Sequence, residues 1–484
     1  MAFIKKLKKG NNTYAIEVEG YRDNKGKVKH RYKKYLGKVG EDGKITPSTQ
    51  KVKVDSVFQY GLPAIVHSTI KELKLRDVFN EYSDELETLT LMQVVNPSSL
   101  TKMLHRTSHI DPEFITPVTR KRADSALEYL QGKKELIEQR IYDKLKGYYH
   151  EDTVFYDITS ITLNGIRSRL AEIGYPEFEP QINIGLCLEA GNGFPLFHEV
   201  FPGNISHKKT LQQILERLKR FGRNKAVLVF DGGVTSTINL ENAKEMGFDV
   251  ITRIPLHPTI KKISHENKTS SPRDMVQLSR SKVYVKEVPW EDGRLLICFN
   301  EKVRVSVKEK RIDEAQTALE KRRMGHPIKE GLEKYLQKTS REWQLNYEEL
   351  EEAEKYDGLY ALYTSLKNMP KEKVVKTYFQ KDRIEKTFQQ MKNALEIKPI
   401  HFQTDKMIRA HVMLCHLAYL VTTWIETRIN ENGLDFTLDA LREVLENTYR
   451  VHILQGEKRT QHISSLTPEQ KKILDAFKCC HNPG

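Results

Sequence analysis

Cysteine is scarce in this chain of 484 residues, and the few cysteines present form no recognisable pattern. There are five, none of them in a paired C-x-x-C spacing, and Cys479 and Cys480 are adjacent, which disfavours a normal disulfide between them. The pattern therefore indicates neither a zinc site nor a disulfide framework. A reducing cytoplasm is the expected compartment.

Long apolar runs are also missing. The longest, residues 410–425, contains His411 and His416 and is shorter than the about 20 residues that span a bilayer. The apolar part of the N-terminus is too brief for a secretory signal. We therefore predict a buried helix over residues 410–425, and no membrane partner.

Positive charge is in excess. The chain has 79 Lys and Arg residues against 65 Asp and Glu residues, a net charge of +14 that is spread along the sequence. This distribution favours a broad surface for a polyanion, with nucleic acid as the leading partner. Many soluble proteins are basic without binding DNA, so the charge alone does not decide the function.

The first 50 residues are predicted to form a small basic module. Residues 13–39 alternate apolar and polar side chains across a turn at 23–26, which is typical of a β-hairpin. Its second strand contains five basic residues: Lys27, Lys29, Arg31, Lys33 and Lys34. The hairpin either contacts DNA or serves as a lid. Residues 51–150 show helical periodicity and are predicted to be a mostly helical region for DNA binding or dimerisation.

From residue 151 the pattern becomes that of a mixed α/β sheet. We predict strands at 153–157, 181–189 and 194–201, a helix at 208–221, a strand at 226–230, a helix at 238–246 and a strand at 248–254. Three antiparallel strands followed by alternating helices and strands belong in one sheet with flanking helices.

An insertion interrupts this domain at about residues 255–356. Its first part is β-like at 282–288 and 295–307, and charged stretches at 310–324 and 330–354 are predicted to be solvated helices. A strand at 358–364 and helices at 408–428 and 438–449 follow. The domain is expected to end near residue 430, and residues 431–484 to form a C-terminal helical region whose last helix starts at a capping box on Thr467.

Two aspartates follow apolar strands directly. Asp157 and Asp231 stand where a strand ends and small or polar residues begin, so their carboxylates should protrude into a crevice at the edge of the sheet. If the two strands are neighbours, the carboxylates converge and repel each other unless hard cations lie between them. Mg²⁺ is the natural counter-ion because it prefers oxygen ligands.

A third carboxylate lies in the helical segment 378–392. At about 100° per residue, Tyr378, Lys381, Glu385 and Lys392 fall within roughly 60° of one another, beside a separate apolar stripe. A surface helix with ordinary i,i+4 charge pairs would look similar. With Asp157 and Asp231, however, Glu385 can hold two metals about 3.5 to 4 Å apart for an in-line phosphodiester displacement. Lys381 and Lys392 would then bind phosphate, and Tyr378 would bond phosphate or stack on a base.

These motifs resemble those of the DDE transposases of bacterial insertion sequences, in the insertion-sequence-four-like group. That group has Tyr, two residues, Arg, three residues, Glu, six residues and Lys; Tyr378, Lys381, Glu385 and Lys392 have the same spacing, with Lys381 in place of the Arg. Lysine lacks the planar fork of arginine. Residues 155–159 and 229–233 look like the two aspartate motifs, and 202–204 is also similar. The resemblance covers about residues 150–430.

The resemblance implies an RNase H-like catalytic core that cuts DNA at terminal inverted repeats and joins the 3′ ends to target DNA. It further implies Mg²⁺ as cofactor, two ions replaceable by Mn²⁺, double-stranded DNA as partner, a homodimer in the synaptic complex, and a nucleoid-associated location in a bacterial or archaeal cytoplasm. Trp290 is a candidate for aiding a hairpin intermediate or an ordinary packing residue. Two other functions stay open: an RNase H-like nuclease without strand transfer, and a domesticated DNA-binding protein without catalysis.

Overall fold

The computed structural model describes residues 2–10, 12–23, 25–46, 52–149, 152–163, 168–174, 179–279, 281–340, 342–395, 397–398, 400–455 and 458–479. The chain divides into two compact units. Unit 1 comprises Met1–Ile65, Ser108–Phe114 and Leu441–Gly484, and unit 2 comprises Val66–Thr107 and Ile115–Ala440. The domain boundaries expected from the sequence stay a prediction, and Cys480 lies outside the described residues.

Unit 1 contains two antiparallel sheets. The predicted hairpin is present and gains a further strand on each side, in the order β1 (Ala2–Lys9), β2 (Asn12–Arg22), β3 (Val28–Val39) and β4 (Ile45–Thr46). The second sheet has the order β19 (Lys458–Ile463), β18 (Tyr449–Gln455) and β5 (Val52–Gln59). Residues 446–449 are therefore not the end of a helix as predicted, because α15 (Leu438–Leu445) stops and β18 begins.

One buried ion cluster and one cap stabilise this unit. Arg450 lies 3.0 Å from Asp111 and stacks over the ring of Tyr60 at 4.6 Å. Helix α16 (Pro468–Ala476) starts at the predicted capping box, with Thr467 accepting a hydrogen bond from the N–H of Gln470. The contacts of Arg450 join segments that are far apart in sequence. The capping box satisfies backbone groups in the first turn of α16, which would otherwise fray.

Unit 2 begins with helices, as predicted for most of the segment 51–150, although residues 52–59 of that segment form strand β5. They are α1 (Gly61–Glu72), which starts in unit 1, α2 (Leu75–Phe79), α3 (Ser83–Val95), α4 (Leu100–Arg106), α5 (Arg120–Gly132) and α6 (Lys134–Leu145). The long helix α14 (Asp405–Glu431) packs against α3, α5 and β9. Its length and apolar composition would suit a membrane span, yet 94% of its most apolar window is buried inside the protein, as predicted for a core helix.

The core sheet has the strand order of an RNase H-like fold. Its five strands run β9 (Pro195–Pro202), β8 (Glu179–Glu189), β6 (Thr153–Thr162), β10 (Val227–Phe230) and β11 (Asp249–Ile254). The first three pair antiparallel and the last three pair parallel. The sequence predicted this series of strands, together with α7 (Leu211–Arg220) and α8 (Thr237–Glu245) between them. Strand β6 continues five residues beyond the predicted end at Asp157.

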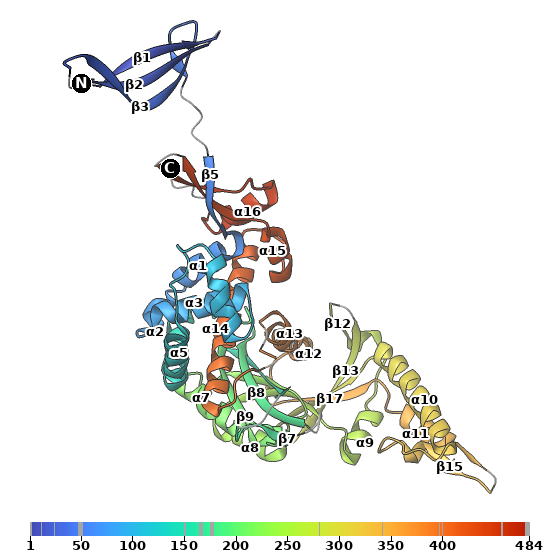
Figure 1. Cartoon of the computed structure of the whole chain (residues 1–484). Coiled ribbons are helices and arrows are strands. Elements are labelled where there is room, and N and C mark those ends of the chain that lie inside the picture. The colour runs from blue at the N-terminus through green and yellow to red at the C-terminus, as the bar shows by residue number, and fades with distance from the viewer. Residues whose placement is uncertain are drawn as a thin grey trace. The chain divides into compact units, whose positions relative to one another are not determined.

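The sheet does not end at β11. It continues through β17 (Leu359–Thr364), β14 (Gly293–Phe299), β13 (Lys282–Trp290) and β12 (Met275–Gln277), while β7 (Glu172–Gly174) pairs with β8 (Figure 1). The β-rich part of the insertion is therefore hydrogen-bonded to the core. Trp290 ends β13 and packs, partly buried, against the main hydrophobic cluster of unit 2.

The rest of the insertion differs from the prediction in two places. Helix α10 (Glu301–Arg323) begins where a strand was predicted to continue, because Asn300 accepts hydrogen bonds from the next two free N–H groups and caps it. The stretch 330–354 is not one helix: β15 (Leu336–Lys338) and β16 (Trp343–Leu345) form a hairpin before α11 (Tyr347–Glu354). Leu336 and Leu345 pack on Ala315 and Ala318 of α10.

Candidate functional site

Asp157 and Asp231 lie side by side on neighbouring parallel strands. The last pair in the register of β6 and β10 joins Tyr156 to Phe230. Asp157 is the next residue of β6, and Asp231 directly follows the end of β10. Tyr156 and Phe230 belong to the cluster that α7 covers, so the residues next to them point to the opposite face of the sheet. The expected convergence of the two carboxylates follows from this register.

The helical segment that crosses this face is broken. Helix α12 (Lys371–Gln380) ends before Lys381, α13 (Asp382–Gln389) follows, and a π-helical turn continues over Gln390–Ala394. α12 contacts β10 and β11, and α13 contacts β6. The single continuous helix assumed for residues 378–392 is therefore wrong. The side chains of Tyr378, Lys381, Glu385 and Lys392 nevertheless all lie on the face of the sheet that α12 and α13 cover.

Tyr378 bonds one of the aspartates. Its hydroxyl donates a hydrogen bond to Oδ1 of Asp231 at 3.1 Å. Burial, followed by the Asp231 carboxylate, raises the pKa of Tyr378 far above its usual range, so the phenol stays a donor at all ordinary pH values.

Lys381 lies among the three carboxylates. Its Nζ is 3.3 Å from Oε1 of Glu385, and its side chain is buried whereas that of Glu385 is 59% exposed. Burial acts to lower the pKa of Lys381, but Asp157, Asp231 and Glu385 outweigh it and raise that pKa. The ammonium therefore stays charged and neutralises part of the site.

Asp157 titrates in an unusual range. Burial raises the pKa of its carboxyl to about 6; Lys381 opposes this shift, and Asp231 and Glu385 add to it. A carboxylate that ionises reluctantly next to two others is a position where an added cation is strongly stabilised.

Lys392 reaches the same strand as Asp157. Its Nζ donates to Oγ1 of Thr159 at 2.5 Å. Thr159 is two residues beyond Asp157 on β6 and so points to the same face. The π-helical turn carries Lys392 to this place.

Contacts that the sequence did not reveal fix the helix that carries Glu385. Arg383 donates to the carbonyl oxygens of Ala190, at 2.7 Å, and Gly191, in the turn between β8 and β9. The hydroxyl of Tyr419 on α14 lies 2.8 Å from Oγ1 of Thr387 and donates to the carbonyl of Gly193 at 3.2 Å. The turn between β8 and β9 is about 190 residues upstream of α13, and Tyr419 is 32 residues downstream of Thr387, so no local pattern could have indicated these partners.

The donor set fits hard divalent ions. Asp157, Asp231 and Glu385 present only oxygen, the ligand type that Mg²⁺ prefers. They do not form a group with all ligand atoms within 4.8 Å of one another. A pair of ions about 3.5 to 4 Å apart needs wider spacing than one ion does. Burial, with Asp231 and Glu385 adding to it, raises the pKa of Asp157 and so disfavours its charged form, which a bound cation would stabilise.

Among the described residues, one group does meet that close spacing: Glu138, His198 and His416. Cations already occupy it, since Oε2 of Glu138 is 3.0 Å from Lys134 and 2.5 Å from Arg217. Burial lowers the pKa of His416 to about 3, so its ring is neutral. We interpret this group as a buried salt-bridge network that joins α6, β9, α7 and α14.

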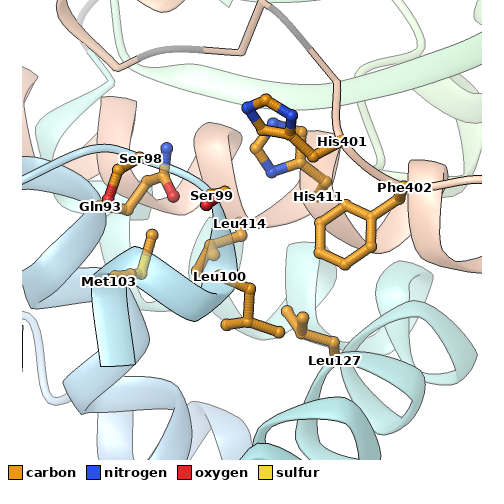
Figure 2. A pocket seen from close by; sticks show the side chains of 10 residues that line it. All are labelled: Gln93, Ser98, Ser99, Leu100, Met103, Leu127, His401, Phe402, His411 and Leu414. Atoms are coloured by element: carbon orange, nitrogen blue, oxygen red, sulfur yellow. The ribbon is translucent and has the colours of Figure 1, made fainter. Parts of the chain in front are cut away.

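Two cavities of unit 2 differ greatly in size. One of about 320 Å³ is lined by Tyr378 and Phe379 of α12, Arg253 of β11, Tyr360 of β17 and the start of α10. It therefore adjoins Asp231 through Tyr378. The other has about 10 Å³, enough for one water, beside the unpartnered Oε1 of Gln93 (Figure 2).

The region that contains this site matches a known family. The sequence model described as the transposase DDE domain matches residues 151–421, more than half of the chain. The chain belongs to the DDE transposase family. Membership identifies it as a transposition enzyme, as the sequence motifs indicated.

No curated protein matches this DDE family member. Among solved structures, a piggyBac transposase synaptic complex with hairpin DNA is similar, with a TM-score of 0.38 and 12% identity over 80% of this chain and 76% of that chain. The individual roles of Asp157, Asp231, Glu385, Tyr378, Lys381 and Lys392 stay predictions.

Proposed function

We propose that this DDE family member is a Mg²⁺-dependent DNA transposase that cuts the terminal inverted repeats of an insertion sequence and joins the 3′ ends to target DNA. One observation carries the proposal: Asp157 and Asp231 directly follow the last register pair of β6 and β10, on the face that α12 and α13 cover, and Glu385 of α13 is close enough to raise the pKa of Asp157. The family match over residues 151–421 supports it.

Asp157, Asp231 and Glu385 would hold two Mg²⁺ ions, with Mn²⁺ able to substitute. When bound, such ions activate the attacking oxygen and stabilise the leaving oxygen of an in-line displacement. The chain's own residues do the rest. The Tyr378 hydroxyl orients the Asp231 carboxylate, and Lys381 keeps Glu385 directed to the cluster. Lys392, held at Thr159, adds positive charge for a backbone phosphate.

The exposed basic residues of the β1–β4 sheet favour DNA as the partner. Every residue of β1 is exposed, and the strand contains Lys5, Lys6, Lys8 and Lys9. The first seven residues of β3 are exposed as well, among them Lys29, Arg31, Lys33 and Lys34. We propose that this sheet contacts the phosphates of the inverted repeats, and that two chains pair in the synaptic complex. The cytoplasmic, nucleoid-associated location follows from that substrate and stays a prediction.

The test is a Glu385→Gln variant with a labelled duplex made from the DNA that flanks the reading frame. We expect DNA binding to persist and Mg²⁺-dependent nicking to fall by at least about 10³-fold, because one ion loses its carboxylate. Glu372→Gln, an exposed site on the neighbouring α12, is the matched control and should nick normally. Unchanged nicking by Glu385→Gln would refute the assignment.

A second readout addresses strand transfer. Incubation of a pre-cut 3′-hydroxyl end with a supercoiled plasmid should yield joined products for a transposase. Nicking without any joined product would identify the alternative, an RNase H-like nuclease.

A further inference from the structure

We propose that Arg253 binds a backbone phosphate of the DNA strand that is cut. The proposal rests on the proposed function and adds to it a residue that no sequence motif marks. Its basis is the position of Arg253 in the sheet, its free guanidinium and the cavity that it borders.

Arg253 stands in one row with the two aspartates. β10 and β11 are parallel, and their last pair joins Phe230 to Thr252. Arg253 is therefore the next residue of β11, opposite Asp231, which directly follows β10. Val250 and Ile254 belong to the cluster on the α7 side, and alternation therefore directs Arg253 to the side of Asp231. With strands about 4.8 Å apart, Arg253 starts one strand from Asp231 and two from Asp157.

Local contacts confirm this placement. A Cβ added to Gly232, the residue after Asp231, would lie 3.7 Å from the Cβ of Arg253. The hydroxyl of Thr235 lies 2.6 Å from that of Thr252 and donates to the carbonyl of Arg253 at 3.1 Å. These hydrogen bonds fix the loop after Asp231 to the end of β11. They therefore hold the backbone of Asp231 at a fixed distance from that of Arg253.

The guanidinium of Arg253 is available. The side chain is exposed and has no carboxylate within ion-pair distance among the described residues. Its guanidinium carbon lies over the ring of Tyr360, 5.5 Å from the centroid, in the wall of the 320 Å³ cavity. An aromatic face orients the planar group and leaves its N–H edges open to a ligand.

The other cations predicted to bind phosphate already have protein partners. Lys381 pairs with Glu385, and Lys392 donates to Thr159. Both are lysines, which cannot present two parallel N–H groups to one phosphate as arginine does. Arg253 therefore supplies the bidentate fork of this site, and a strand whose scissile phosphate meets Asp157 and Asp231 brings a neighbouring phosphate within its reach.

The experiment compares Arg253→Ala and Arg253→Lys with the unchanged protein on the same flanking duplex. Arg253→Ala should lower the single-turnover cleavage rate by about 10²-fold and reduce the slope of log affinity against log salt concentration by about one. Arg253→Lys keeps the charge, so it should restore the slope but only part of the rate. Arg106→Ala, an exposed arginine of α4, is the matched control.

Neutral methylphosphonates placed one at a time near the cut site identify the contacted phosphate. At one position, the methylphosphonate should slow cleavage by the unchanged protein. The same methylphosphonate should not slow cleavage by Arg253→Ala any further, because that variant has already lost the contact. Equal sensitivity of both proteins at every phosphate, or equal losses in Arg106→Ala, would overturn the proposal. Asp231→Asn distinguishes failure of the proposed function from failure of the role of Arg253. If Asp231→Asn still nicks DNA, the proposed function is refuted. If Asp231→Asn does not nick but Arg253→Ala nicks normally, only the role of Arg253 is refuted.

Discussion

The carboxyl of Asp157 has a pKa of about 6, against an ordinary value of 3.8, because burial and two nearby carboxylates oppose its ionisation. The unfolded chain therefore loses this proton at lower pH than the folded protein does. The resulting penalty on folding is absent below about pH 4 and complete above about pH 6, where it amounts to at most about 3 kcal/mol.

Asp157→Asn should remove this penalty. In EDTA at pH 7 we expect the variant to unfold a few degrees higher than the unchanged protein, and the difference to vanish near pH 4. Thermal unfolding followed by circular dichroism from pH 4 to pH 8 measures it. Millimolar Mg²⁺ should raise the unfolding temperature of the unchanged protein at pH 7 but not that of the variant. Parallel pH curves for the two proteins would mean that Asp157 ionises normally.

Residue types at the site were predictable, but their partners were not. The spacing of Tyr378, Lys381, Glu385 and Lys392 pointed to one site, and all four side chains do lie on one face of the sheet. The hydrogen bond from Tyr378 to Asp231 depends on pairing across 147 positions, which composition and periodicity do not encode locally. Arg253 was missed for the same reason, since only the register of β11 aligns it with Asp231.

At the level of secondary-structure elements, the break between α12 and α13 was the main surprise. Lysine favours helices, so nothing at Lys381 signals an interruption. The break lets α12 pack on β10 and β11, while α13 and the π-helical turn after it bring Glu385 and Lys392 over β6. The hairpin of β15 and β16 was also not predicted. The many charged residues of this stretch favoured a solvated helix, although Leu336 and Leu345 in fact pack on α10.

Tyr419→Phe tests how firmly α13 must be held. Loss of the hydroxyl removes the contact with Thr387, which keeps its bond to the carbonyl of Arg383, and leaves the carbonyl of Gly193 without this donor. We expect a cost of about 1 to 3 kcal/mol in unfolding free energy. Nicking should slow while affinity for the duplex stays unchanged, because the phenylalanine keeps the packing but frees the position of Glu385. Urea unfolding and single-turnover cleavage measure the two effects.

Tyr347→Phe is the matched control, because Tyr347 is 67% exposed at the start of α11. It should leave both stability and cleavage unchanged. A Tyr419→Phe protein that is destabilised but nicks at the normal rate would mean that this contact serves folding alone.

For the whole molecule, the order of strands and helices in the core was largely predictable, because each apolar run is local and bounded by turns or charges. The extension of the sheet into the insertion was not predictable, since β14 reaches β17 across about 60 residues. Local patterns also could not reveal the division into two units: residues 1–65, 108–114 and 441–484 come together through contacts such as those of Arg450 with Asp111 and Tyr60.

Replacing Lys6 and Lys8 together by glutamine tests the role of the β1–β4 sheet. Both lysines are exposed and lie on the same face of β1. If each contacts a phosphate, the slope of log affinity against log salt concentration should fall by about two, while the cleavage rate of saturated complexes stays normal. Fluorescence anisotropy of a labelled duplex measures the slope. Lys102→Gln with Lys121→Gln provides a charge-matched comparison; an equal decrease there would argue against a specific role of the sheet.

The ladder from β11 through β17 to β14 also limits how this enzyme can be trimmed. All six residues of β17 are buried, and both of its sides are hydrogen-bonded. A shortened chain without β13 and β14 would leave one side of β17 as an unpaired, apolar edge strand, on which the strands of other chains could pair. The stretch between Ile254 and Leu359 can therefore vary in surface charge or loop length, but its strands cannot be removed without exposing the protein to aggregation.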